Sequence, residues 1–349
     1  MMEKVENTGM PLHALTDRRP TSQREERNRY YCGPRSDHFD GVRFFNPGQP
    51  DTDRSFGQIL QWKLREKAAR WPKSVQIVPV KPDQRVDGLR VTMVGHMTAL
   101  IQIDGLNILT DPVWSQRASP SQIIGPKRVT APGVSFEDLP NIDAVLISHN
   151  HYDHLDSGSV RRLVAAHNPL FITPLGNEAI IRSIAPDSNI VEGDWNDHFA
   201  LSQTVNVAIT QCNHWSARTV GDRRMALWSG FFIRANAGAV WFAGDTGYGD
   251  GTVFRSIGDR YGSPDIALIP IGSYEPRWFM AAQHVNPAEA VQIMRDVEAK
   301  LTLGVHWGTF QLTDEAFDAP LHALSEALAD AGIDAGRFPA ARPGDVFEV

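Results

Sequence analysis

The chain is 349 residues long, and 42% of its residues are hydrophobic and 21% charged, so it can bury a large core. Its formal net charge of −7, from 34 Lys and Arg against 41 Asp and Glu, argues against a protein that neutralises nucleic acid phosphates. Two cysteines, Cys32 and Cys212, exclude a disulfide framework and suit a reducing compartment. No apolar run approaches the roughly 20 residues that span a bilayer, and the N-terminus has no signal-peptide pattern, so we expect a cytoplasmic protein.

The first 40 residues differ in composition from the rest of the sequence. The segment from Thr21 to Arg29 is polar and charged and has no apolar face. Such runs are usually solvated, although an arm that binds a partner would have the same composition. We therefore expect residues 1–40 to form a flexible or loosely packed N-terminal extension and residues 41–349 to form one folded domain.

Short segments with strand-like composition recur from about residue 88 onward. Several are apolar throughout, as strands that are covered on both faces tend to be. Glycine or a polar residue follows many of them, which marks the strand end. The predicted strands are Leu89–Val94, Thr98–Ile103, Asn107–Leu109, Ala144–Ile147, Leu170–Ile172, Val205–Thr210, Leu227–Ile233, Ala239–Phe242, Ile266–Ile271 and Leu301–Val305.

Three helical segments lie between or after these strands. Asp156 is a good N-cap for the first of them. Asn286 is a second N-cap, with proline at the first helical position and Glu289 at the third. An apolar stripe predicts the third helix and consists of Phe317, Leu321, Leu324 and Leu328. Strands that alternate with helices in this way predict a layered α/β fold with the helices on the outer faces.

The loop at residues 148–156 carries the strongest chemical signal. It follows a predicted strand and precedes a predicted helix, a place where functional groups are common. In an extended chain His149 and His151 lie on the same side, and the turn that follows directs Asp153 and His154 to a neighbouring point. Three imidazoles and one carboxylate within six residues form a metal-ligand set, and without a thiolate they suit zinc and its first-row neighbours.

Three more candidate ligands follow predicted strands further along the chain, namely His214, Asp245 and His306. A buried strand that ends in one such polar side chain is costly unless the group is paired or bound to a metal. Each of the three would by itself be interpreted as structural. Together with the loop at 148–156, however, they indicate a single centre with seven ligands.

The order His-x-His-x-Asp-His, followed by His, Asp and His, resembles that of the metallo-β-lactamase superfamily. Within it the sequence resembles the branch of N-acylphosphatidylethanolamine-hydrolysing phospholipases D. The branch is indicated by Tyr274–Arg277, Gln283–Pro287 and His306–Phe310, and the resemblance covers most of residues 38–349. Other matching segments are Val94–Ala99, Thr110–Val113, His151–Asp156 and Phe242–Tyr248. The resemblance implies a four-layer αββα sandwich, here with an N-terminal extension, and a hydrolase site at one edge.

The resemblance also implies how two zinc ions share the seven ligands. One zinc would take His149, His151 and His214, the other would take Asp153, His154 and His306, and Asp245 would bridge the two. The histidine at 151 favours zinc over a di-iron pair, because oxygen-reducing relatives commonly carry glutamate there. A hydroxide between the ions is the expected nucleophile, since zinc lowers the pKa of bound water to about 7.

Three residues are expected to take part in the reaction, namely Asp153, Asp245 and His284. His284 precedes the helix N-terminus at Asn286, which favours anions, so we expect it to bind the phosphate or assist the leaving group. A role in holding the loop is the alternative. We interpret His96 as a structural residue or one that contacts the ligands.

Four further side chains are candidates for substrate contact. Arg277 could hold a phosphate through two hydrogen bonds, or it could pair with an acid such as Glu275. Trp215, Tyr248 and Tyr274 could line an acyl-chain groove with the neighbouring segment 278–280, or they could belong to the core.

These observations predict a di-zinc phosphodiesterase of the phospholipase D type. It would cleave N-acyl-phosphatidylethanolamine-like lipids to phosphatidate and N-acylethanolamine. A lactonase, thioesterase or amidase on the same fold is the alternative, and a metal-stabilised binding protein without activity is a third. A phospholipid or another small ester is the expected partner, and no nucleic acid partner is expected. A homodimer and peripheral contact with the inner face of a membrane stay open, because no strongly hydrophobic amphipathic anchor is evident.

Overall fold

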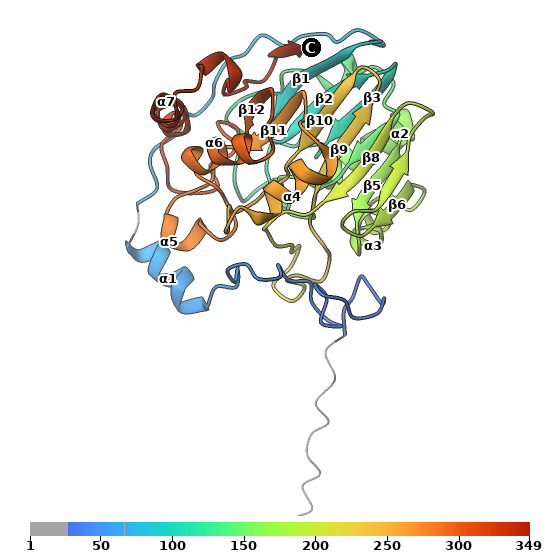
Figure 1. Ribbon diagram of the computed structural model, residues 1–349. Helices are drawn as coiled ribbons and strands as arrows, with labels where there is room; N and C mark the ends of the chain where they lie inside the picture. Colours follow the sequence, from blue (N-terminus) through green and yellow to red (C-terminus); the bar gives the residue numbers. More distant parts are fainter. Residues whose placement is uncertain (1–26, 66) are drawn as a thin grey trace, which may run out of the picture.

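The computed structural model describes residues 27–65 and 67–349, and two β-sheets form its centre (Figure 1). The first sheet contains β1 (Leu89–Gly95), β2 (Thr98–Ile103), β3 (Leu106–Thr110), β4 (Ala144–Leu146), β5 (Leu170–Pro174), β6 (Asn189–Gly193) and β13 (Val346–Glu348). The second contains β7 (His198–Ala200), β8 (Asn206–Thr210), β9 (Gly230–Ala235), β10 (Gly238–Phe242), β11 (Ile266–Pro270) and β12 (Leu301–Val305). Their strand orders are β13-β1-β2-β3-β4-β5-β6 and β12-β11-β10-β9-β8-β7.

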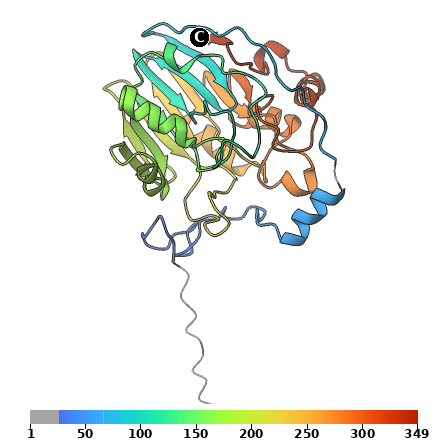
Figure 2. The same ribbon diagram turned by 180° about the vertical axis from the view of Figure 1, so that it is seen from behind.

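Helices cover the outer face of each sheet. The helices are α1 (Phe56–Arg65), α2 (Ser157–His167), α3 (Asn177–Ile184), α4 (Thr252–Tyr261), α5 (Arg277–Met280), α6 (Pro287–Asp296) and α7 (Ala319–Ala331), with the 3-10 turns Phe136–Asp138 and Ala335–Arg337. In Figure 1, α4 and α6 lie in front of the six-stranded sheet, and Figure 2 shows α2 across the other sheet from behind. The predicted αββα sandwich is therefore confirmed.

The central strands are apolar throughout because both of their faces are covered. In β2, Ile101 packs into the core between the sheets, whereas Leu100 packs under the helices of the first sheet. In β10, Val240 packs into the central core and Trp241 packs under the helices of the second sheet. Successive side chains of a strand point to opposite faces, so a sandwich with helices outside needs hydrophobic residues at every position of these strands.

The predicted strands are all present, except that β9 begins only at Gly230, three residues later than expected. The strands that the sequence did not predict are β6, β7 and β13. All three lie at sheet edges, and in β7 and β13 no residue is fully buried. An edge strand is covered less completely than a central one, so its hydrophobic pattern is weaker.

Two predicted helix caps are confirmed at the N-termini of α2 and α6. The side chain of Asp156 accepts hydrogen bonds from the backbone of Gly158 and Ser159. Asn286 Oδ1 accepts from the Glu289 backbone at 2.9 Å, and Glu289 Oε2 accepts from the Asn286 backbone at 3.0 Å. This reciprocal capping box begins α6 directly after the loop that carries His284.

The Asn286→Ala variant is expected to lower the free energy of unfolding by about 1 kcal/mol, because it leaves the Glu289 backbone N–H without its acceptor. Denaturant titration measures the change. Asp318→Ala is the matched control, since Asp318 occupies the N-cap of α7 without a side-chain capping bond. It should shift stability by less than about 0.5 kcal/mol. Equal losses in both variants would contradict the assigned cap.

The described part of the N-terminal segment packs against the sandwich. Asn28 Nδ2 donates to the Met225 carbonyl at 2.8 Å, and Tyr30 donates its hydroxyl to Asp222 at 2.7 Å. Phe39 is buried against Trp228 in a small apolar cluster. We expected residues 1–40 to be flexible or loosely packed, whereas within residues 28–40 aromatic side chains such as Phe39 pack on the body. Residues 1–26 lie outside the described part of the chain.

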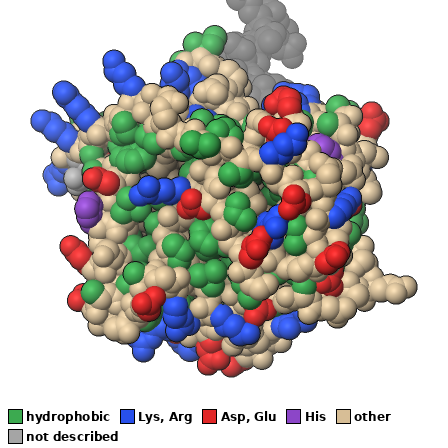
Figure 3. Space-filling model, turned by 90° about the horizontal axis from the view of Figure 1, so that it is seen from above, with side chains coloured by type: hydrophobic (Ala, Val, Ile, Leu, Met, Phe, Trp, Pro, Cys, Tyr) green, Lys and Arg blue, Asp and Glu red, His purple; other side chains and the backbone are tan. Residues whose placement is uncertain are grey.

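The helices that the structure describes are all too short or too polar to cross a bilayer. The face on the side of the C-terminal strand is shown in Figure 3, where Lys and Arg side chains alternate with Asp and Glu among hydrophobic ones. Charges of both signs are thus interspersed on this face.

Candidate metal centre

The loop between β4 and α2 folds tightly at one edge of the sandwich. His151 accepts backbone hydrogen bonds from both His154 and Leu155, so the chain turns directly after the second histidine. Asp156 then caps α2. This turn brings His149, His151, Asp153 and His154 together, as the spacing predicted.

A first cluster of three imidazoles lies at one side of the loop. His149 Nε2 is 2.8 Å from His151 Nδ1, which is 3.3 Å from His214 Nε2. His214 comes from the segment that follows β8, a strand of the second sheet. The three nitrogens lie close enough together to hold one metal ion.

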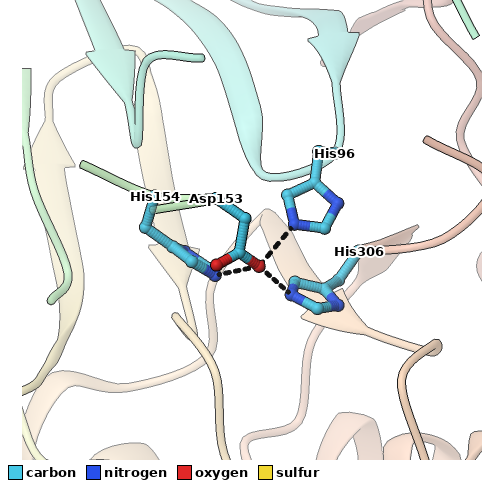
Figure 4. Close-up of side chains that lie close together, drawn as sticks. All are labelled: His96, Asp153, His154 and His306. Atoms are coloured by element: carbon cyan, nitrogen blue, oxygen red, sulfur yellow. Dashed lines mark hydrogen bonds and ion pairs between the residues drawn. The ribbon is translucent and has the colours of Figure 1, made fainter. Parts of the chain in front are cut away.

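A second cluster lies beside the first and is shown in Figure 4. Asp153 Oδ2 is 3.3 Å from His154 Nε2 and 3.4 Å from His306 Nε2. His306 directly follows β12 and has a left-handed backbone, with φ of 62°. His96, from the turn between β1 and β2, joins this cluster with its Nε2 atom 3.0 Å from Asp153 Oδ2.

Asp245 lies between the two clusters. Its Oδ2 atom is 3.1 Å from His154 Nε2 and 3.2 Å from His306 Nε2, and 3.8 Å from His214 Nε2 in the first cluster. The residue follows β10 in the turn that begins with Gly244. The structure thus brings together all seven side chains that the sequence singled out as ligands.

Residues outside this set hold the histidine rings in place. Asp111 accepts hydrogen bonds from His154 Nδ1 at 2.7 Å and from the Ser148 backbone at 2.7 Å. Ser148 Oγ lies 2.9 Å from His149 Nδ1, and the Gln283 carbonyl accepts from His214 Nδ1 at 2.9 Å. In each of these rings, the outer bond leaves Nε2 facing the centre. Sequence reasoning assigned no role to Asp111, although its place directly after β3 was the available signal.

The first cluster is electrically neutral at pH 7. Burial lowers the pKa of His151 and of His214 to about 3, and it lowers the pKa of His149 well below its usual value. Each ring therefore keeps a lone pair, which is the form that binds metals.

The second cluster contains carboxylates and protonated imidazoles, whose opposite charges compensate one another. Burial by itself would raise the pKa of Asp245, but His154 and His306 hold it well below its usual range. Burial would likewise lower the pKa of His306, but Asp245 and Asp153 raise it to about 9. A metal ion that binds here would displace the imidazolium protons, because its positive charge takes over their pairing with the carboxylates.

Several buried atoms of the centre lack hydrogen-bond partners among the described residues. Those on proposed ligands include His154 Nε2, Asp245 Oδ1 and His306 Nε2. Buried polar atoms are almost always satisfied, so three such atoms in one place need an explanation. Imidazole and carboxylate donors suit zinc and other first-row divalent ions, and metal ligation would satisfy these atoms.

A cavity of about 500 Å³ opens above the centre. His151, Asp153, Asp245 and His284 lie on its polar side. Its apolar wall comes from α1, from α5 and from the segment after β12, through Ile59, Trp62, Phe279, Met280 and Leu312. Helices α1 and α5 lie side by side in both ribbon views, and the rings of Trp62 and Phe279 are 4.8 Å apart. The sequence did not predict α1.

The structure brings two of the predicted substrate contacts to this cavity, Trp215 and His284. His284 Nδ1 lies 3.9 Å from Asp245 Oδ2, and burial lowers its pKa to about 3. The Trp215 ring stacks at 3.5 Å on the guanidinium of Arg223, which also lines the cavity.

The other predicted contacts, Tyr248, Tyr274 and Arg277, do not line the cavity. Arg277 pairs with both carboxylate oxygens of Glu289, at 2.7 and 2.9 Å. Tyr248 donates its hydroxyl to Asp296 at 2.8 Å. Tyr274 is buried. The structure therefore does not bring these three predicted contacts to the cavity, because their side chains are engaged or enclosed elsewhere.

Comparisons with known proteins define the class of this protein. Residues 106–307 match the family model of the beta-lactamase superfamily domain. The chain belongs to this superfamily and is a metal-dependent hydrolase, as its sequence predicted.

Two similar proteins narrow the class. Over 250 residues the chain is 38% identical to N-acyl-phosphatidylethanolamine-hydrolyzing phospholipase D 1 of Caenorhabditis elegans, an alignment that covers 69% of this chain and 70% of that protein. Over 246 residues it is 37% identical to the mitochondrial N-acyl-phosphatidylethanolamine-hydrolyzing phospholipase D of Saccharomyces cerevisiae, covering 69% of this chain and 52% of that protein. The resemblance to this branch is thereby confirmed.

The fold also matches solved structures. The isothiocyanate hydrolase from Delia radicum gut bacteria superposes with a TM-score of 0.59 at 19% identity, covering 74% of this chain and 99% of that structure. At this identity the likeness concerns the fold.

Proposed function

We propose that the protein is a di-zinc phosphodiesterase that cleaves N-acyl-phosphatidylethanolamine-like lipids to phosphatidate and N-acylethanolamine. One zinc would be held by His149, His151 and His214 and the other by Asp153, His154 and His306, with Asp245 shared. Bound zinc would neutralise phosphate oxygens and lower the pKa of water at the site. The observation that carries the proposal is the position of Asp245 Oδ2, within 4 Å of nitrogens from both clusters.

The cavity supports a substrate with a polar and an apolar part. Metal-binding side chains line one side, while Trp62, Phe279 and Met280 form an apolar cluster on another. A phosphodiester could lie over the first and an acyl chain against the second. His284 lines the same cavity and would donate a hydrogen bond to a phosphate oxygen or to the leaving group. The names of the two phospholipase D relatives support the same substrate class.

Metal analysis combined with a lipid-product assay tests the proposal. We expect about two zinc ions per chain, and mass spectrometry should detect N-acylethanolamine released from N-acyl-phosphatidylethanolamine vesicles. Exhaustive chelation should abolish this release, and zinc should restore it. Turnover of a lactone, a thioester or nitrocefin in the same panel, without release from the lipid, would instead favour the carbonyl-directed alternative. Release that survives chelation would contradict the proposal.

We also propose that the α1–α5 side of the cavity contacts a phospholipid surface. Phe56 and Leu64 of α1 are 80% and 76% exposed, and Trp278 of α5 is 43% exposed. Exposed apolar side chains in this number beside a cavity are typical of an interaction site. Basic residues lie at the end of α1 and after it, and anionic lipids would attract them, namely Arg65, Lys67, Arg70 and Lys73.

The double variant Phe56→Ser with Leu64→Ser is expected to weaken binding to anionic vesicles by about tenfold or more, because each apolar side chain contributes about 1.5–3 kcal/mol when fully buried. Vesicle sedimentation measures the change. Hydrolysis of soluble bis-p-nitrophenyl phosphate should stay the same. The control is Val346→Ser in β13, whose strand lies away from α1 in both ribbon views. Equal vesicle binding by all three proteins would exclude this surface.

A further inference from the structure

We propose that His96 is a positioning residue that donates a hydrogen bond from Nε2 to Asp153 Oδ2 and so orients this carboxylate toward the second metal ion. The inference rests on the proposed function, because it takes Asp153 as a metal ligand. His96 would not itself bind a metal ion. Its role would be to fix the orientation of one ligand, Asp153.

The hydrogen bond identifies the proton on the ring. His96 Nε2 lies 3.0 Å from Asp153 Oδ2, and the His96 side chain is only 1% exposed (Figure 4). An ionised carboxylate only accepts hydrogen bonds, so Nε2 must carry the proton. Nδ1 has no hydrogen-bond partner among the residues that the structure describes. The bond to Asp153 is therefore the polar contact that accounts for a buried imidazole at this position.

His96 also connects two parts of the second cluster that are far apart in the sequence. Its carbonyl accepts from the His306 backbone at 3.0 Å, and its own backbone N–H donates to Thr309 Oγ1 at 3.1 Å. The rings of His96 and His306 lie 4.1 Å apart. The residue thus contacts Asp153 through its side chain and the His306 loop through its backbone and ring.

The backbone of His96 is in a sparsely populated region, with φ of 58°. Such a conformation is uncommon for residues other than glycine and persists where the surrounding structure requires it. Here the left-handed turn between β1 and β2 directs the ring inward to Asp153. Substitution of a residue that hydrogen-bonds to a metal ligand typically lowers metal affinity or activity by 10- to 100-fold.

Two substitutions of His96 distinguish the effect of losing the hydrogen bond from an effect on folding. Asn tolerates a left-handed backbone but its side chain is too short to reach Asp153, whereas the Gln amide can reach and donate. We expect His96→Asn to bind its more weakly held zinc ion about 10- to 100-fold less tightly in competition with a chromogenic chelator. His96→Gln should lose less than tenfold. His167→Asn, in the last turn of α2, is the control and should equal the original protein.

Two further measurements keep the outcome clear. Thermal melting of the metal-free proteins should be similar for His96→Asn and His96→Gln, so that a folding defect is excluded. In the zinc-loaded protein, nitrogen NMR should show a proton on His96 Nε2. Unchanged zinc affinity in His96→Asn would overturn the inference, and so would zinc bound to Nε2, which would make His96 a ligand. Unchanged affinity in Asp153→Asn would refute the metal assignment itself, separately from the role of His96.

Discussion

Asp245→Asn is expected to reduce kcat by well over 100-fold and to lower the zinc content. The carboxylate has one oxygen near nitrogens of both clusters, and its neutral amide replacement offers the centre no negative charge. Loss of an outer-sphere partner alone costs 10- to 100-fold, so loss of a shared ligand should exceed this range. His154 and His306 would also lose the carboxylate that raises their pKa. Without metal, this attraction would no longer hold the two rings in position.

The measurement combines steady-state kinetics on the lipid with metal analysis of the purified variant. Asp250→Asn is a matched control, because Asp250 lies five residues later in the same loop but is exposed. It should retain full activity and two metal ions. If Asp245→Asn kept both zinc ions and normal turnover, a shared role for this residue would be untenable.

His284→Ala is expected to lower kcat by about 100-fold or more while both metal ions are retained. A positioned proton donor or acceptor contributes about 10²- to 10⁴-fold. His284 lines the cavity and lies 3.9 Å from Asp245 Oδ2, but all seven proposed ligands are present without it. Because burial lowers its pKa to about 3, the ring is neutral at pH 7 and can donate one hydrogen bond to the substrate.

Kinetics and metal analysis should be measured on the same preparation, since loss of metal would produce a similar fall in kcat. His322→Ala is the control, because this exposed histidine lies in α7, outside the cavity lining. Normal turnover in His284→Ala would show that the residue only holds its loop.

The residues of the proposed metal centre could be predicted from the sequence because their pattern is largely local. His149, His151, Asp153 and His154 lie in one loop, so strand and turn geometry alone bring them together. His214, Asp245 and His306 each directly follow a strand or its loop, and their polarity contrasts with the apolar segments before them. Buried parallel strands end at a common edge, which is where a ligand site in such a fold is expected.

The supporting residues were less accessible to sequence reasoning. Asp111 bonds to Ser148 and His154, and His96 bonds to Asp153. All of these partners lie more than 30 positions away, and no local pattern marks such a partner. The wall of the cavity depends on α1, a helix with exposed apolar side chains whose place beside α5 comes from the packing of Trp62 on Phe279.

Sequence patterns also suggested substrate contacts that the structure does not bring to the cavity. Arg277 and Tyr248 lie in segments that match the phospholipase branch, yet their side chains pair with Glu289 and Asp296. A segment's composition restricts which groups are present near a site, but the direction of each side chain depends on the partners that folding brings to it.

The proposed ligand set and the apolar strands that precede it thus follow from the sequence alone, because period-two burial and metal-binding side chains are short-range patterns. Three features arise only when the two sheets pack. They are the position of Asp245 between the two clusters, the His154 tautomer that Asp111 sets, and the choice between cavity and core for each aromatic residue. Those features depend on contacts between distant segments, and such contacts stabilise the protein only once it has folded.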